Sequence, residues 1–377
     1  MVGGPVDWDL VVVGAGPAGA AAALGALAAE PGLSVLLLDR QDFPRDKACG
    51  DGIAPHVFDL LAEVGVTGLV DDRTPVRRLA LRRGGLGVDR LMERPAWVVP
   101  RTIFDQRLVE AARAAGAELR RHRVRALDVR RSAVRVDDLF EAGVVVGADG
   151  AHSVVRRTLG LPAGPTALAL RGYAPTPDGR SARQVIVFGT ARRPSYAWSF
   201  DRGDGLSNVG YGEQLLAGRS RPTRAEMLDR LEELLPGAGV GGMNWRGHHL
   251  PLSSWSWRPA AGRVLLAGDA AGLINPMTGE GIYYAVATGL LAGRAAAAAV
   301  RRDDGGAGSE YRRSTARLLA RHLRHTALTA RLTRSGRVLE AGIRASAADQ
   351  RVFDDLVELG LAAGRITPAM LRGLVTR

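Results

Sequence analysis

Cysteine, lysine and aromatic residues are scarce in this 377-residue chain. The only cysteine is Cys49, which excludes an intramolecular disulfide and predicts a protein of the reducing cytoplasm. No apolar run approaches the roughly 20 residues of a membrane-spanning helix. The opening residues, MVGGPVDWD, have no basic residue ahead of the first apolar stretch, so we expect no signal peptide.

Positive charge is abundant, and almost all of it is arginine. The net charge is +12, and a single lysine, Lys47, stands among 51 basic residues. Such a charge attracts nucleotide phosphates, a diphosphate substrate or an anionic membrane surface, although a solvated arginine-rich surface explains it equally well. The sequence has no nucleic-acid-binding motif and no metal-ligand spacing, so we expect neither a nucleic-acid partner nor a metal.

The chain opens with a strand, a glycine turn and a helix. The apolar run of residues 9–13 (DLVVV) predicts a buried strand, the alanine-rich stretch after it a helix, and residues 33–40 a second, parallel strand. The turn between them, GAGPAG, is a G-x-G-x-x-G, whose glycines permit a tight bend and bring a diphosphate close to the helix N-terminus. Asp39 follows Gly19 by 20 residues, the position where this fingerprint binds a ribose hydroxyl.

Two later turns also place an aspartate at the end of a buried strand. Asp149 lies in GADGAHS after a VVV strand, and Asp269 lies in LAGDAAG after a VLL strand. The carboxyl ends of such strands are where α/β sheets bind their ligands. Taken in this order, the three motifs resemble those of the FAD-dependent aromatic hydroxylases and their relatives. The resemblance implies that FAD is the cofactor and that Asp269 binds its ribityl and diphosphate part.

The stretch NPMTGEGI, residues 275–282, begins a long alanine-rich helix. Backbone N–H groups at a helix N-terminus are suited to stabilise negative charge on a reduced flavin ring. The same resemblance places Gly281 and Ile282 against the isoalloxazine and Arg101 near the FAD. The cofactor contacts that it implies are Gly14, Gly16, Ala18, Gly19, Asp39, Arg40, Cys49, Gly50, Gly52, Arg101, Val124, Asp149, Gly150, Asp269, Pro276, Gly279, Gly281 and Ile282.

Three stretches of the sequence indicate which branch of these FAD-dependent proteins the chain resembles. RDKACGDGIAP resembles the K-x-C-G-(D/G)-G motif of the geranylgeranyl reductases and the related reductases of menaquinone tails. YAWSF, followed by GDGLSNVGYG, resembles their Y-x-W-x-F-P motif, and GDAAGLINPMTGEGIYYA resembles their third FAD motif. The resemblance covers residues 9–300. The chain departs from it at Asp201, where the family usually has proline, and in the tail beyond Arg301.

These patterns predict an α/β fold in three parts: a Rossmann-type FAD-binding domain, an inserted antiparallel-sheet substrate domain and a helical C-terminal region. The strand-like runs between residues 165 and 257 and their Gly, Pro and Ser content indicate the inserted sheet. We place the FAD-binding domain at residues 1–75, 100–162 and 258–300, the substrate domain at 76–99 and 163–257, and the helical region at 301–377.

The resemblance implies an FAD-dependent oxidoreductase that reduces carbon–carbon double bonds of a prenyl, isoprenoid or related apolar substrate. NADPH or NADH is the expected transient electron donor. Tyr196, Trp198 and Phe200 are spaced by two, so on a strand they share one face suited to an apolar channel, although ordinary core packing gives the same spacing. Cys49 is either a proton donor or a small group packed beside the flavin. Lys47 either steers nicotinamide phosphates or is solvated.

Two other functions fit the same scaffold. One is an FAD-dependent monooxygenase acting on a small natural-product substrate, and the other is a flavin-bound lipid- or partner-binding protein without turnover. A basic helix over residues 311–344, with nine arginines and one glutamate, either lies on anionic lipid headgroups or is a solvated helix face. If the helix lies on lipid headgroups, the enzyme is expected at the inner face of the membrane.

Overall fold

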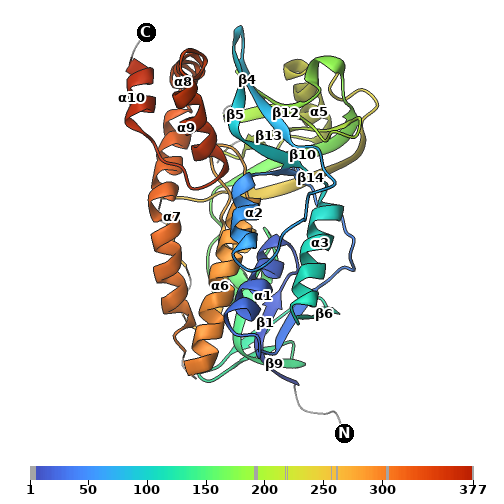
Figure 1. Cartoon of the computed structure of the whole chain (residues 1–377), viewed down its shortest axis with the longest axis vertical. Coiled ribbons are helices and arrows are strands. Elements are labelled where there is room, and N and C mark those ends of the chain that lie inside the picture. Colours follow the sequence, from blue (N-terminus) through green and yellow to red (C-terminus); the bar gives the residue numbers. More distant parts are fainter. Residues whose placement is uncertain are drawn as a thin grey trace.

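The computed structural model describes residues 6–190, 194–216, 218, 220–255, 257–259, 262–302 and 305–375. Two sheets, one above the other in Figure 1, share the molecule with a group of C-terminal helices along one side. The predicted fold class is confirmed: a Rossmann-type sheet, an inserted sheet that is almost wholly antiparallel, and a helical C-terminal region.

The first sheet is the dinucleotide-binding one. Its strands follow the order β6-β2-β1-β9-β8-β7, and β15 pairs with β9. The pairs β1–β2, β1–β9, β2–β6 and β9–β15 are parallel, whereas β7 and β8 extend the sheet in antiparallel fashion. The bounds are β1 Val6–Val13, β2 Val35–Asp39, β6 Glu118–Arg121, β7 Leu127–Val129, β8 Val134–Val136, β9 Phe140–Gly147 and β15 Val264–Leu266.

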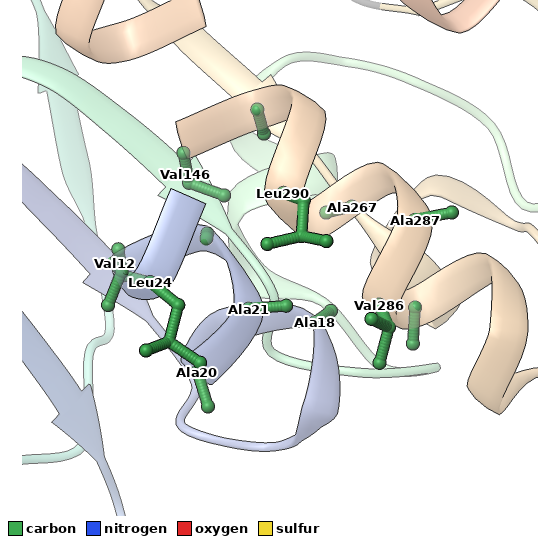
Figure 2. Packing of buried hydrophobic residues seen from close by; sticks show 14 of the residues in the cluster. Val12, Ala18, Ala20, Ala21, Leu24, Val146, Ala267, Val286, Ala287 and Leu290 are labelled. Carbon is green, nitrogen blue, oxygen red and sulfur yellow. The ribbon is translucent and has the colours of Figure 1, made fainter. Parts of the chain in front are cut away.

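Helices α1 (Pro17–Ala29) and α6 (Ile282–Arg302) cover one face of this sheet and pack against each other (Figure 2). Their alanine and glycine faces bring the backbones into contact. A Cβ at Gly289 would lie 2.3 Å from the carbonyl oxygen of Ala18, and one at Gly293 would lie 2.0 Å from that of Ala22. These pairs show that the helices run in the same direction. The two helices therefore begin at the same edge of the sheet.

The second sheet follows the order β14-β10-β13-β12-β11-β4-β5-β3. All its pairs are antiparallel except β11–β4. The bounds are β3 Gly52–Ile53, β4 Val76–Arg83, β5 Leu86–Val98, β10 Thr166–Pro175, β11 Arg183–Phe188, β12 Ser195–Asp201, β13 Leu206–Gln214 and β14 Met243–Pro251. Besides α1 and α6, the described helices outside the C-terminal group are α2 Pro55–Ala62, α3 Arg101–Ala114, α4 Val154–Thr158 and α5 Arg224–Leu234.

The C-terminal helices are α7 (Ala307–Leu332), α8 (Gly336–Ala348), α9 (Gln350–Leu361) and α10 (Pro368–Val375). The expectation of one basic helix over residues 311–344 is wrong, because Ser335 takes an extended conformation and Gly336 begins a new helix. Helix α7 runs alongside α6, whereas α8 and α9 pack on β5 (Figure 1). By length and composition α6 could span a membrane, but 83% of its most apolar window is buried inside the protein.

Candidate active site

A cavity of about 380 Å³ extends from the glycine turn of the first sheet, along the second sheet, to the C-terminal helices. Gly16 and Asp269 line one end, Cys49 and Trp198 line the middle, and Leu371 of α10 lines the far end. Eleven of the predicted cofactor residues share its wall: Gly16, Ala18, Cys49, Gly50, Gly52, Arg101, Asp269, Pro276, Gly279, Gly281 and Ile282. The three predicted substrate residues, Tyr196, Trp198 and Phe200, line it as well.

The glycine turn is built to hold a diphosphate. Gly14 has a φ of 99°, and a Cβ there would lie 2.4 Å from the carbonyl oxygen of Ala148, so only glycine fits. Helix α1 begins at Pro17 with no side-chain cap among the described residues, which leaves its first N–H groups free for a ligand. Because a strand, an uncapped helix and a glycine cradle converge here, the turn fits the diphosphate of FAD.

Arg45 and Asp39 complete this end of the site. The Asp39 carboxylate accepts a hydrogen bond of 2.9 Å from the backbone N–H of Ala15. The Arg45 guanidinium lies 3.6 Å from Asp39 and 3.3 Å from Asp105. It also stands 3.2 Å from the position that a Cβ of Gly16 would occupy. A cation therefore lies directly over the glycine turn, where the phosphates of the cofactor carry negative charge.

Lys47 joins the loop of residues 46–52, which we call the DKACGDG loop, to the third cofactor motif around Asp269. Its Nζ lies 2.8 Å from the Asp269 carboxylate. Burial alone would raise the pKa of Asp269, but the Lys47 ammonium lowers it below its ordinary value. Asp269 is therefore ionised, which suits a carboxylate that accepts hydrogen bonds from ribityl hydroxyls.

Arg101 begins α3 and is almost fully buried. Its guanidinium donates two hydrogen bonds to Asp105, of 2.5 and 2.7 Å. Although burial opposes its charge, the Asp105 carboxylate raises the pKa of Arg101. A fixed positive charge thus faces Cys49 and Glu280 across the cavity.

Asn208 of β13 ties the DKACGDG loop to the second sheet. Its amide donates hydrogen bonds of 2.8 Å to the Cys49 carbonyl and to the Asp51 carboxylate. Its own carbonyl oxygen accepts the indole N–H of Trp198, also at 2.8 Å. Tyr173 of β10 donates a further bond of 2.6 Å to Asp51. The loop that carries the thiol is therefore held against the strand that carries the aromatic wall.

The aromatic wall consists of Tyr196, Trp198 and Phe200 on β12. Their ring centroids lie 5.8 Å apart between Tyr196 and Trp198 and 6.4 Å apart between Trp198 and Phe200. The Tyr196 hydroxyl donates to the carbonyl of Thr278, which fixes the wall to the loop before α6. The predicted shared face is present, and it forms one side of the cavity.

Three titratable groups meet around the middle of the cavity. Burial raises the pKa of the Cys49 thiol, so the thiol stays protonated at neutral pH. Burial also raises the pKa of Asp51 to about 6 and that of Glu280 to about 7. Glu280 Oε1 accepts the backbone N–H of Tyr283 at 2.9 Å, so this carboxyl caps the start of α6.

Seven predicted cofactor residues do not line the cavity. Asp149 accepts hydrogen bonds from the Ser153 hydroxyl and the Val154 N–H, so its carboxylate caps α4. Asp39 lies at the end of β2 beneath the glycine turn. The other five are Gly14, Gly19, Arg40, Val124 and Gly150, and for all seven residues the contacts with a cofactor remain predictions.

Sequence reasoning missed several residues of the wall. His248 of β14 lines the cavity beside Lys47, and burial lowers its pKa to about 4. Its ring and that of His249 lie 6.3 and 5.4 Å from the His152 ring. The far end is made by side chains of α7 to α10, for which no motif exists. For Asp51 the sequence did carry a signal, because the residue belongs to the DKACGDG loop.

The fold and this site define a flavoprotein. Residues 7–177 match the family described as FAD binding domain. The solved structure of a geranylgeranyl bacteriochlorophyll reductase-like protein from Thermoplasma acidophilum superposes with a TM-score of 0.80 at 21% identity, covering 98% of this chain and 96% of that one.

Two curated relatives specify the family. A menaquinone reductase of Mycolicibacterium smegmatis is 36% identical over 318 residues, 75% of each chain. A digeranylgeranylglycerophospholipid reductase of Methanothrix thermoacetophila is 32% identical over 341 residues, 84% of this chain and 85% of its own. The chain belongs to the geranylgeranyl reductase family and is an FAD-dependent oxidoreductase, as the K-x-C-G motif predicted.

Proposed function

We propose that the protein reduces isolated carbon–carbon double bonds in a prenyl chain or a related apolar substrate. The observation that supports this function most directly is the cavity, which connects the polar cofactor end to a long apolar end through the aromatic wall. The names of the two curated relatives support the same substrate class. When bound and reduced, FAD supplies a hydride.

The chain's own residues provide the rest of the reaction. An isolated alkene is not polarised, so catalysis depends on holding it in place, excluding water and supplying a proton. The aromatic wall orients the chain of the substrate, and Trp198 is held by its bond to Asn208. The Cys49 thiol, protonated at neutral pH and on the cavity wall, is the proton donor. NADPH or NADH is the electron donor. The sequence has a single dinucleotide fingerprint, which FAD occupies, so the nicotinamide cofactor binds only transiently.

An anaerobic assay tests this function. The flavoprotein is incubated with NADPH, or with dithionite, and a prenyl alcohol or menaquinone, and mass spectrometry measures the addition of two hydrogens. Cys49→Ala is expected to keep FAD and to lose most of this activity, and an unchanged turnover would remove Cys49 from the reaction. In a parallel assay in air, substrate-dependent uptake of O₂ would instead indicate the monooxygenase. A flavin that NADPH does not bleach with any added alkene would indicate a binding protein.

We further propose that the far end of the cavity opens onto an anionic membrane. Leu332 of α7 and Leu371 and Leu374 of α10 line the cavity and are nevertheless 42%, 54% and 36% exposed. Leu328, one turn before Leu332, is 40% exposed. We call these four leucines the mouth. An apolar rim at a cavity that receives an apolar chain is suited to contact with lipid.

Charge around the mouth favours an anionic bilayer over a protein partner. Arg331, Arg334, Arg337 and Arg365 are exposed, and in the described part of the chain none of them forms an ion pair. Arginines near an anionic surface each contribute on the order of 1 kcal/mol to binding. The enzyme would thus act at the inner face of the membrane, with the mouth rather than the whole of α7 as the contact.

Flotation with vesicles rich in phosphatidylglycerol tests the contact. Leu371→Ser combined with Leu374→Ser is expected to abolish flotation at low salt. The matched control is Leu91→Ser combined with Leu139→Ser, which changes two leucines of comparable or greater exposure elsewhere. Equal flotation of both double variants, or no flotation of the unmodified protein, would exclude the mouth as a membrane contact.

A further inference from the structure

Asp51 stands two residues from Cys49 and is completely buried, with 0% exposure. Its backbone has a φ of 59°, a left-handed conformation that aspartate and asparagine tolerate better than most residues. Only Gly50 separates Asp51 from Cys49, so the carboxyl group and the thiol share one turn of chain, and the charge of Asp51 contributes to the raised pKa of the thiol. Asp51 also lines the cavity.

The two carboxyl oxygens of Asp51 differ in their surroundings. Oδ2 accepts both the Tyr173 hydroxyl, at 2.6 Å, and the Asn208 amide, at 2.8 Å. Oδ1 is buried without a hydrogen-bond partner in the described structure. When the carboxyl is protonated, the proton therefore belongs on Oδ1, because both hydrogen bonds to Oδ2 are donated to it.

The groups that face Asp51 come from three elements. Burial raises its pKa to about 6, while Arg171 of β10, the hydrogen bonds from Tyr173 and Asn208, and Arg101 of α3 act against that rise. The carboxyl is thus balanced between its charged and neutral forms near neutral pH. A group balanced in this way exchanges protons readily in both directions.

Resting on the proposed function, we propose that Asp51 returns a proton to Cys49 after each reduction. In the reaction, the S–H bond of Cys49 breaks as a C–H bond forms on one alkene carbon, while the hydride forms the other C–H bond. The Asp51 O–H bond at Oδ1 then breaks, and its proton re-forms the thiol. The Asp51 carboxylate, stabilised by Tyr173 and Asn208, afterwards takes a proton from water.

Glu280 is the other carboxyl near the thiol, and its position argues against this role. Its Oε1 accepts the Tyr283 N–H and so is engaged in capping α6. It also lies at the helix N-terminus where the flavin ring is expected. Asp51 differs because its unpartnered oxygen and the Cys49 sulfur belong to the same short loop.

The single cysteine allows a direct test without turnover. The rate at which iodoacetamide alkylates the apoprotein, measured against pH, reports the titration of Cys49 alone. Because the Asp51 charge disfavours the thiolate, Asp51→Asn is expected to increase the alkylation rate at neutral pH by about 3- to 10-fold. The matched control is Asp201→Asn, another buried aspartate, which ends β12 and hydrogen-bonds Thr176 and the Ala182 N–H.

Turnover then tests the proton transfer from Asp51 to Cys49, which we call the relay. Asp51→Asn is expected to leave the first reduction by pre-reduced enzyme nearly intact, to slow steady-state turnover at least tenfold and to remove the inflection near pH 6 from its pH profile. Should Asp51→Asn fail to fold, Tyr173→Phe is expected to move that inflection to higher pH, because the carboxylate loses a donor.

The outcomes separate the two proposals. If the unmodified enzyme reduces alkenes and Asp51→Asn changes neither thiol titration nor steady-state turnover, the relay is wrong. If the unmodified enzyme reduces no alkene while Asp51→Asn still shifts the thiol titration, the proposed function is wrong and the coupling of the two groups stands.

Discussion

The Lys47 ammonium lies 2.8 Å from the Asp269 carboxylate, although 222 residues of chain separate the two. This ion pair connects the loop that carries Cys49 to the third cofactor motif. Lys47 is the only lysine in the sequence, whose other strongly basic residues are all arginines. A compact ammonium fits beside a half-buried carboxylate where a planar guanidinium needs more room.

Removing this cation is expected to weaken the binding of FAD. Lys47→Ala leaves the Asp269 carboxylate without its partner, and charged hydrogen bonds of this kind contribute about 1.5–3 kcal/mol, which corresponds to a roughly 10- to 100-fold higher Kd. Lys47→Arg keeps the charge and is expected to recover part of the affinity. Quenching of flavin fluorescence on titration with apoprotein measures both, and an unchanged Kd in Lys47→Ala would contradict the role.

The Trp198 indole is expected to stabilise the fold through its bond to Asn208. Trp198→Phe retains an aromatic ring but leaves the Asn208 carbonyl oxygen, in a residue with 0% exposure, without its donor. The free energy of unfolding should fall by about 1–3 kcal/mol. Urea denaturation measures it, with Trp255→Phe, at a site 63% exposed, as the control expected to change it by less than about 0.5 kcal/mol.

The stability of the apoprotein should depend on pH through Asp51. Burial raises its pKa from 3.8 to about 6, so the folded protein holds a proton that the unfolded chain releases in that interval. Its contribution is fully present below the unfolded value and is lost as the pH rises to about 6, on the order of 3 kcal/mol. Unfolding of the unmodified protein and of Asp51→Asn, compared at each pH, isolates this effect. A difference that does not change with pH would show that the pKa of Asp51 is the same in the folded and unfolded protein.

The close contact of α1 and α6 should tolerate no added methyl group. Gly293→Ala places a Cβ 2.0 Å from the Ala22 carbonyl oxygen, so a helix must shift and the free energy of unfolding should fall by at least about 3 kcal/mol. Gly342→Ala, in the middle of α8 with open space around it, should instead increase stability by up to about 1 kcal/mol. Thermal denaturation of the two apoproteins distinguishes these opposite signs.

Much of the cofactor end was predictable, because its chemistry is local in sequence. A glycine turn between a strand and a helix leaves little freedom in where Gly16 and Asp39 lie. The spacing of Tyr196, Trp198 and Phe200 predicted their common face for the same reason, since a strand alternates its side chains.

The far end of the cavity was not predictable from motifs. Leu332 and Leu371 line the same cavity because α7 ends at Leu332 and α10 packs beside α8, and nothing in the sequence near either leucine encodes the other. Asp149 shows how one aspartate can have two structural uses. Its position after a buried strand predicts a cofactor contact, which stays a prediction, and its carboxylate also accepts a hydrogen bond from the start of α4, as an aspartate before a helix commonly does.

The contact between α1 and α6 also determines when the flavin site is complete during synthesis. Helix α1 leaves the ribosome among the first residues of the chain, yet the helix that covers it ends at Arg302. The whole second sheet is made in between, and β15 joins β9 only shortly before α6 follows. A chain that stops after residue 177 carries the complete nucleotide fingerprint but exposes the alanine face of α1. The part of the cavity wall formed by residues 276–282 is therefore added only when most of the chain has been made.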